Sequence, residues 1–378
     1  MNHKIITTIA VGLCFSSLTV HAANRVADGR GNGMGNTGVT SANYLLAPFY
    51  NPALTAVYRG DDDFGLLLPA IGARVSDSDK SLETIDDLQD TINDFENNPT
   101  IANEAQLNAY LDQLDGNKPL AVAGGVAVAV AIPLDLLSVN VFSSGYAEVL
   151  AQPVIFESND TTTRYENSTV DTLAFAYSEV GVALAKQITL FGLPMSLGVS
   201  PKFQELETYK QEISIRDFDV SDYDQTKTSK SAFNMDLGAV WFYHNFRGGL
   251  AVKDLFSQDI DTQDVGGVDK YELDTQVTVS GAYATEVITA SVDWDLTKQG
   301  RFVNREDDTR YLRFGLEGNA FGWLQARLGY EFELEDTLDD TFTAGVGFSP
   351  GDLFHFDLAG SYAGSNQFGL SGNLAFTF

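Results

Sequence analysis

The chain has 378 residues, and its 52 acidic and 23 basic residues give a formal net charge of −29. Because such a surface repels polyanions, nucleic acid is not expected as a partner. Cys14 is the only cysteine, and no apolar run after residue 22 is long enough for a membrane-spanning helix. Disulfide-based folds and helical membrane proteins are therefore excluded as classes.

Residues 1–22 have the pattern of a secretory signal peptide. A short basic start that contains Lys4 precedes a mostly apolar stretch over residues 5–20, and the small residue Ala22 marks the expected cleavage site. Leu13, which precedes the cysteine, is too large for a lipoprotein cleavage site. We therefore expect an exported mature chain with no cysteine and no lipid anchor.

Residues 23–63 are rich in glycine and small polar residues and show no strand-like alternation. Pro52 fixes its own φ angle and Asn51 can close a local turn with its side chain, so a rigid bend is predicted. An ordinary turn is the alternative. The bend and its neighbours are Phe49, Tyr50, Asn51, Pro52 and Ala53.

Residues 64–378 contain fourteen segments in which apolar and polar residues alternate, as they do along β-strands. In the clearest segment, Leu328 faces one side and Arg327 the other. The predicted strands are 64–73, 119–131, 136–149, 169–187, 195–208, 232–243, 246–256, 271–284, 286–297, 309–319, 323–335, 341–349, 353–363 and 366–378.

The connections between these segments alternate between short and long. A β-barrel with short periplasmic turns and long outer loops has this asymmetry, and an even number of strands places both of its ends on the periplasmic side. The long connections are polar and acid-rich, and they comprise residues 74–118, 150–168, 209–231, 257–270 and 298–308.

Residues 80–115, in the first long connection, are predicted to be helical, because apolar residues recur there at intervals of three and four. Ser81 is a suitable helix start. The apolar residues are predicted to pack the two helices on each other. They are Leu82, Ile85, Leu88, Phe95, Leu107 and Leu111.

The last strand carries aromatic and aliphatic residues on one face, as expected for a strand that contacts lipid. Phe376 and Phe378 are predicted to be the assembly signal that the barrel-insertion machinery reads. The predicted fold class is therefore all-β, a transmembrane outer-membrane β-barrel of about 14 antiparallel strands in a Gram-negative bacterium, surrounded by outer-membrane lipid. A soluble β-sandwich is the alternative.

Fourteen strands enclose a lumen too wide for wall side chains alone to fill. Residues 23–63 are therefore predicted to lie inside the barrel as a hatch. Charged residues are also predicted to face the lumen, where they could bind a ligand headgroup or form ion pairs that stiffen the wall. These residues are Lys202, Asp236, Arg313, Glu317, Arg327, Glu331 and Asp357.

The sequence contains no strong signal for catalysis or metal binding. The acidic run at residues 61–63 lacks the ligand spacing of a calcium loop, so no metal or other cofactor is predicted. His355 lies near Asp357 in sequence, and Ser361 and Ser371 follow on nearby strands, which is a weak signal for a hydrolase. No catalytic residue is therefore predicted, and the chain is not expected to be an enzyme.

The glycine-rich residues 32–38 and the run APFYNPAL at residues 47–54 resemble the hatch of the long-chain fatty acid transporter family FadL. Within that group the chain is most similar to the TraF-like outer-membrane proteins of plasmid transfer operons, with which it shares this run and the acidic helical insert. The thioredoxin-like TraF of conjugation systems is a different, soluble protein, and its redox role would require a mature cysteine.

The resemblance implies a passive channel for hydrophobic or amphipathic small molecules, opened by movement of residues 51–53. The ligand would be captured near the helical outer loop, in a groove formed by its apolar residues Leu82, Ile85, Leu88, Phe95, Leu107 and Leu111, and passed through the lumen. Packing of the two helices on each other is the alternative for these residues. The alternative is a surface or structural barrel that acts in conjugation, in adhesion or as a phage receptor.

Overall fold

The computed structural model describes residues 27–60, 62–190, 192–218, 226–303 and 307–378. The predicted signal peptide lies outside these ranges.

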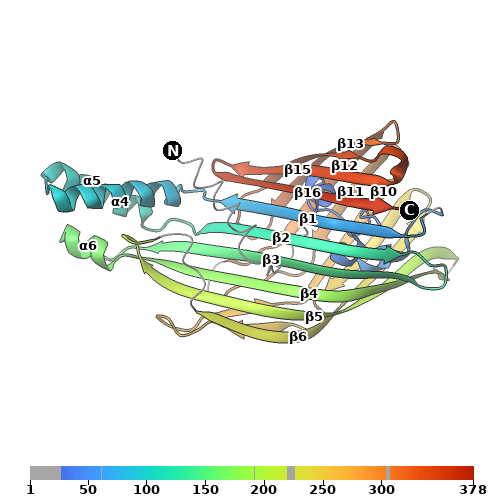
Figure 1. Ribbon diagram of the computed structural model, residues 1–378, viewed down its shortest axis with the longest axis horizontal. Helices are drawn as coiled ribbons and strands as arrows, with labels where there is room; N and C mark the ends of the chain where they lie inside the picture. The colour runs from blue at the N-terminus through green and yellow to red at the C-terminus, as the bar shows by residue number, and fades with distance from the viewer. Residues whose placement is uncertain (1–26, 61, 191, 219–225, 304–306) are drawn as a thin grey trace.

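Fourteen antiparallel strands close into one barrel (Figure 1). The barrel closes where β1 pairs with β16, its Gly65 opposite Thr377. The barrel strands are β1 (Gly65–Ser76), β2 (Leu120–Ile132), β3 (Ser138–Val154), β4 (Thr169–Leu190), β5 (Leu193–Ser214), β6 (Lys227–Tyr243), β7 (Phe246–Lys253), β10 (Gln276–Ala284), β11 (Ile288–Asp295), β12 (Tyr311–Ala320), β13 (Leu324–Glu333), β14 (Thr341–Phe348), β15 (Phe354–Gly364) and β16 (Gln367–Thr377). The predicted fold and strand number are confirmed.

Apolar side chains face outward along these strands, and polar or small ones face inward. Leu370 on β16 is 72% exposed, whereas its neighbour Ser371 is buried. On β5, Phe203 is 66% exposed and its neighbour Lys202 is buried. The alternation seen in the sequence therefore corresponds to a lipid-facing band outside and a polar lining inside.

The two ends of the barrel differ, as the connection lengths predicted. At the end where β1 begins and β16 finishes, the connections are tight, and His244 turns the chain between β6 and β7 with a φ of 54°. We call this the turn end. At the opposite end, the loop end, helices project away from the barrel (Figure 1).

The helices at the loop end are α4 (Ser81–Asn97), α5 (Ile101–Leu114) and α6 (Thr161–Asn167). The first two occupy the predicted helical insert. Asp77 accepts hydrogen bonds from the first amides of α4, at 2.7 Å from the Ser81 nitrogen, so Ser81 is the first helical residue rather than the cap. Within the described ranges, no helix is long and apolar enough to cross a membrane.

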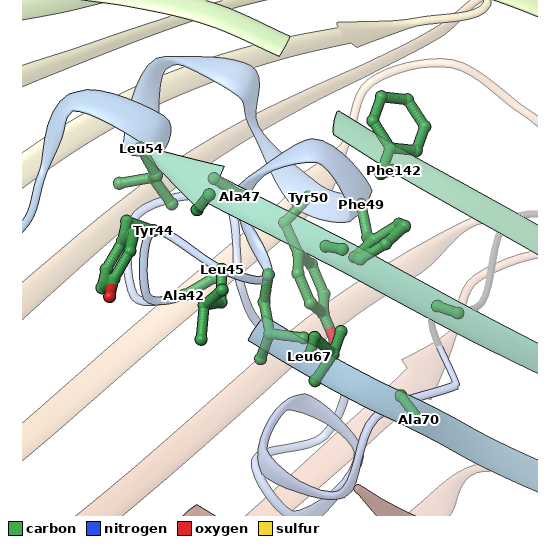
Figure 2. Packing of buried hydrophobic residues seen from close by; sticks show 14 of the residues in the cluster. Ala42, Tyr44, Leu45, Ala47, Phe49, Tyr50, Leu54, Leu67, Ala70 and Phe142 are labelled. Carbon is green, nitrogen blue, oxygen red and sulfur yellow. The ribbon is translucent and has the colours of Figure 1, made fainter. Parts of the chain in front are cut away.

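Residues 27–60, which we call the hatch, occupy the lumen toward the turn end. The hatch contains α2 (Gly29–Gly33), α3 (Ala47–Tyr50) and the 3-10 helix η1 (Pro52–Ala56). Its apolar side chains pack against inward-facing wall residues, and Figure 2 shows Leu45 and Phe49 near Leu67 and Phe142 of the wall. Burial of these apolar surfaces holds the hatch in place.

A second segment enters the lumen from the loop end. Residues 254–275, which we call the loop-end plug, include a hairpin of β8 (Gln258–Asp261) and β9 (Lys270–Leu273). Tyr271 of this plug stacks on Phe175 of the wall, with 3.5 Å between the ring centroids. The prediction of a solvated outer loop over 257–270 and one continuous strand over 271–284 is therefore wrong.

Candidate functional site: the hatch and the cavities beside it

The predicted bend at residues 51–53 anchors the hatch to the barrel wall. The Asn51 Oδ1 atom accepts the Ala53 amide at 3.0 Å and caps η1, while its Nδ2 donates to the Val39 carbonyl at 2.9 Å. Pro52 occupies the first turn of η1, where its missing N–H costs nothing. From β5, Ser196 Oγ donates to the Ala53 carbonyl at 2.6 Å. The rigid bend is present, and it lies inside the barrel.

Inward-facing glycines of the wall form the seat of this bend. A side chain at Gly198 would collide with the backbone of Pro52 and Ala53, and one at Gly238 would collide with the Asn51 side chain. Only glycine allows the hatch backbone to approach the strands so closely. These glycines were not predicted as part of the site, although their inward-facing positions on predicted strands are a signal of close backbone approach.

Phe49 and Tyr50 hold the hatch together from within. The Phe49 ring meets Phe142 of β3 edge to face, with centroids 5.6 Å apart. The Tyr50 hydroxyl donates to Asp28 at 2.5 Å, and its ring covers Gly38. Tyr50 therefore connects the second half of the hatch to α2.

A chain of polar contacts encloses α2. Arg30 donates two hydrogen bonds to Glu317, at 2.9 and 3.0 Å, and the same carboxylate accepts Arg327 Nε at 2.6 Å. Arg327 also pairs with Asp357 at 2.6 Å. Asn373 bonds to the other oxygen of Asp357 and accepts the Gly29 amide at 2.8 Å, which brings the chain of contacts back to α2.

The remaining predicted lumen charges are also paired. Arg313 lies 2.9 Å from Asp295, and Glu331 accepts a hydrogen bond from Asn36 of the hatch at 2.6 Å. Lys202 contacts three carboxylates at 2.9 to 3.2 Å, those of Glu179, Asp236 and Asp254. Of the two predicted roles, ion pairs within the lumen and a site for a ligand headgroup, these contacts correspond to the ion pairs.

The predicted ligand groove on the helical insert is not open in this structure. Ile85, Leu88, Leu107 and Leu111 are buried, and Leu82 and Phe95 pack against the same cluster. The cluster also includes Val122, which shares the lipid-facing side of β2. The helices bury their apolar faces on each other and on the outer surface of the strand ends, so the alternative of helix packing describes these residues.

The predicted assembly signal lies at the closing seam of the barrel. Phe378 exchanges backbone hydrogen bonds with Phe64, at 2.8 and 3.0 Å, and Phe376 contacts Phe354 of β15 edge to face. Recognition by an insertion machinery stays a prediction. His355 Nε2 lies 3.0 Å from Thr377 Oγ1, so a partner of this histidine is a threonine on the neighbouring strand.

Two cavities lie on opposite sides of the hatch. The first, which we call the chamber, has a volume of about 80 Å³ and is lined by Ala27 and Asn32 of the hatch and, toward the loop end, by Tyr146. Much of its remaining wall is alanine and glycine. The second, the vestibule, has a volume of about 780 Å³ and lies at the turn end, where Arg30 and Ser41 of the hatch line it.

Taken together, the fourteen antiparallel strands, the outward apolar band and the lumen filled by an N-terminal hatch define a FadL-like outer-membrane β-barrel. Among solved structures, this fold is shared by the Ralstonia pickettii toluene transporter TbuX, at 14% identity and a TM-score of 0.53 over 93% of this chain and 98% of that one. The Pseudomonas putida toluene transporter TodX has 11% identity and a TM-score of 0.54 over 95% and 98% of the two chains. The CymD monoaromatic hydrocarbon channel has 11% identity and a TM-score of 0.51, covering 96% and 99%.

At these identities the likeness concerns the fold. A comparison with curated proteins finds no match. The sequence model of the family described as F plasmid transfer operon, TraF, protein matches residues 48–295, which is more than half of the chain. The chain belongs to this family.

Proposed function

We propose that this protein is a passive channel for hydrophobic or amphipathic small molecules in the outer membrane of a Gram-negative bacterium. The turn end faces the periplasm and the loop end faces the outside. The barrel-insertion machinery places it in the membrane, and it has no catalytic role. Transport requires the loop-end plug and the hatch to move, because together they obstruct the lumen.

The observation that carries this proposal is a chamber beside the hatch, on its loop-end side. Alanine and glycine are the commonest residues of the chamber wall, and its charged residues are two basic and two acidic ones, of which Arg301 lies 3.4 Å from Glu148. A small, largely apolar molecule fits such a lining. TbuX, TodX and CymD, which are named as transporters or channels for toluene and monoaromatic hydrocarbons, support the same class of substrate.

A disulfide lock on the hatch tests the proposal. Thr37 of the hatch and Ser291 of β11 place their hydroxyl oxygens 2.7 Å apart, so the double variant Thr37→Cys/Ser291→Cys can form a disulfide. The readout is uptake of the fluorescent apolar dye N-phenyl-1-naphthylamine by cells that carry the protein in their outer membrane. We expect uptake by the parent protein and by the reduced variant, and background uptake by the oxidised variant.

The single variants Thr37→Cys and Ser291→Cys are the matched controls, because neither can cross-link and both should behave like the parent protein. Equal uptake by the oxidised and reduced double variant would contradict a moving hatch. Background uptake by the parent protein would instead favour a surface or structural barrel with a sealed lumen.

A further inference from the structure

The short helix α2 separates the chamber from the vestibule. Ala27 and Asn32 line the chamber, whereas Arg30, between them in sequence, lines the vestibule. One turn of backbone therefore has a cavity on each side. Displacement of this turn would join the two cavities with the bend at residues 51–53 still in place.

The composition of α2 makes it the part of the hatch that costs least to move. Three of its five residues are glycine, and its remaining side chains, Arg30 and Asn32, are polar. Its approach to the wall is backbone against backbone, since a Cβ atom added at Gly33 would lie 3.1 Å from the Gly345 Cα atom. Moving α2 exposes little apolar surface, so the hydrophobic effect hardly opposes it.

The second half of the hatch is held very differently. Its large apolar side chains, among them Leu45, Phe49 and Leu54, are buried in one cluster with the wall. Exposing them to water would cost free energy in proportion to their apolar area. The bend at residues 51–53 is therefore the fixed part of the hatch rather than its gate.

Several contacts hold α2, among them the Gly29 amide on Asn373 and the Tyr50 hydroxyl on Asp28, and the ion pair of Arg30 with Glu317 is one that lies within reach of water. Arg30 and Glu317 are 15% and 12% exposed, and Arg30 borders the vestibule, so water can replace the pair when it opens. Two parallel N–H···O bonds make the contact directional as well as strong. The family model matches residues 48–295 and therefore covers none of the charged residues in this chain of contacts, which are Arg30, Glu317, Arg327 and Asp357.

From these observations we propose that the route through the hatch opens at α2, and that the pair of Arg30 with Glu317 is the latch that keeps it closed. This inference rests on the proposed channel function. In the closed state Arg30 blocks the vestibule side of the passage. Release of its guanidinium from Glu317 lets α2 swing toward the vestibule and connects the chamber to the turn end.

Replacing the latch residues tests this inference by ion conductance in planar bilayers and by dye uptake. Arg30→Gln and Glu317→Gln each remove the charge-assisted pair, so both should raise the open probability roughly ten-fold. Arg30→Lys keeps the charge but loses the two-bond geometry, and it should fall between the parent and Arg30→Gln. If Arg30→Gln does not assemble, Glu317→Gln decides the outcome from the wall side.

The matched control is Lys253→Gln. Lys253 Nζ donates to the Phe49 carbonyl at 3.1 Å, so this variant removes a charged contact to the other half of the hatch. It should keep the conductance of the parent protein. Equal open probabilities for Arg30→Gln, Glu317→Gln and the parent would overturn the latch, as would a Lys253→Gln variant as open as Arg30→Gln.

The two readouts keep this inference separate from the proposed substrate class. Raised ion conductance in both latch variants, without dye uptake by any variant, would uphold the latch and reject transport of apolar molecules. Dye uptake by the parent protein, with no change of conductance or uptake in the latch variants, would uphold transport and reject the latch.

Discussion

Lys202 lies at the centre of a fully buried cluster in the lumen, where its ammonium contacts Glu179, Asp236 and Asp254. A single cation is thus shared among three carboxylates on three neighbouring segments of the chain. Gln204 adds hydrogen bonds to Glu179 and Asp254. Charges removed from water in this way are tolerated only while their partners stay in place.

Lys202→Met keeps most of the volume of the side chain and removes its charge. The three carboxylates would then lie close together without a cation, and we expect the variant to lose about 3 to 5 kcal/mol of stability toward urea. The measurement is the urea midpoint followed by tryptophan fluorescence. Lys230→Met is the control, since Lys230 pairs with Asp259 at the surface and should change the midpoint little. Equal midpoints for the two variants would contradict a structural role for the cluster.

The sequence predicted which charged residues face the lumen but not what they contact. Strand alternation alone placed Glu317, Arg327 and Asp357 on the inner face. Arg30 was missed as a functional residue, because it stands alone in a glycine-rich segment with no periodicity. Its partner Glu317 is 287 residues away in sequence, and no local pattern reports a contact over that separation.

Among the elements, the hatch was predictable and the loop-end plug was not. The glycine-rich residues 32–38 and the Asn51 to Ala53 bend indicated a segment that packs tightly inside the barrel. Residues 257–270 are polar and acidic, which is typical of a solvated loop. The structure instead turns Ile260, Tyr271 and Leu273 into the lumen, because a two-stranded hairpin can bury its few apolar residues on one face while its polar residues bond to the wall.

The connection that leads into β12 contains a buried acid beside this plug. Phe302 packs edge to face on Tyr271, and its amide donates to Asp307 at 3.1 Å. Burial raises the pKa of the Asp307 carboxyl to about 7, from an ordinary value of 3.8. At a pH between 3.8 and about 7, the carboxyl is therefore neutral in the folded protein and ionised in the unfolded chain.

Asp307 therefore stabilises the folded state least at high pH. Its contribution is fully present below an ordinary aspartate pKa and is lost as the pH rises through about 7. As the pH rises from about 4 to about 8, we expect the urea midpoint of the parent protein to fall relative to that of Asp307→Asn. Asp264→Asn, at an exposed site within the loop-end plug, is the control. If the difference in urea midpoint between Asp307→Asn and the parent protein does not vary with pH, the raised pKa of Asp307 is contradicted.

The barrel contains or carries three successive layers along its axis. The hatch fills the turn end, and the helices α4 to α6 extend from the opposite end (Figure 1). The loop-end plug lies in the lumen near that opposite end, where Tyr271 contacts Phe175 and Glu148 of the wall. The barrel and its polarity were predictable, because lipid outside and a polar lumen inside impose a period of two on every strand. The order of the obstructions along the axis was not, since it depends on contacts between distant segments.

The N-terminal segment lies inside the barrel, and a single cross-link between the hatch and the wall tests this placement. Thr40 of the hatch and Ser280 of β10 place their hydroxyl oxygens 2.6 Å apart, and the chain has no cysteine after residue 14. In the double variant Thr40→Cys/Ser280→Cys, purified in its folded form, mild oxidation should join the two positions in nearly every molecule, as read by peptide mass spectrometry. A folded barrel in which both thiols stay free would contradict a hatch lodged in the lumen.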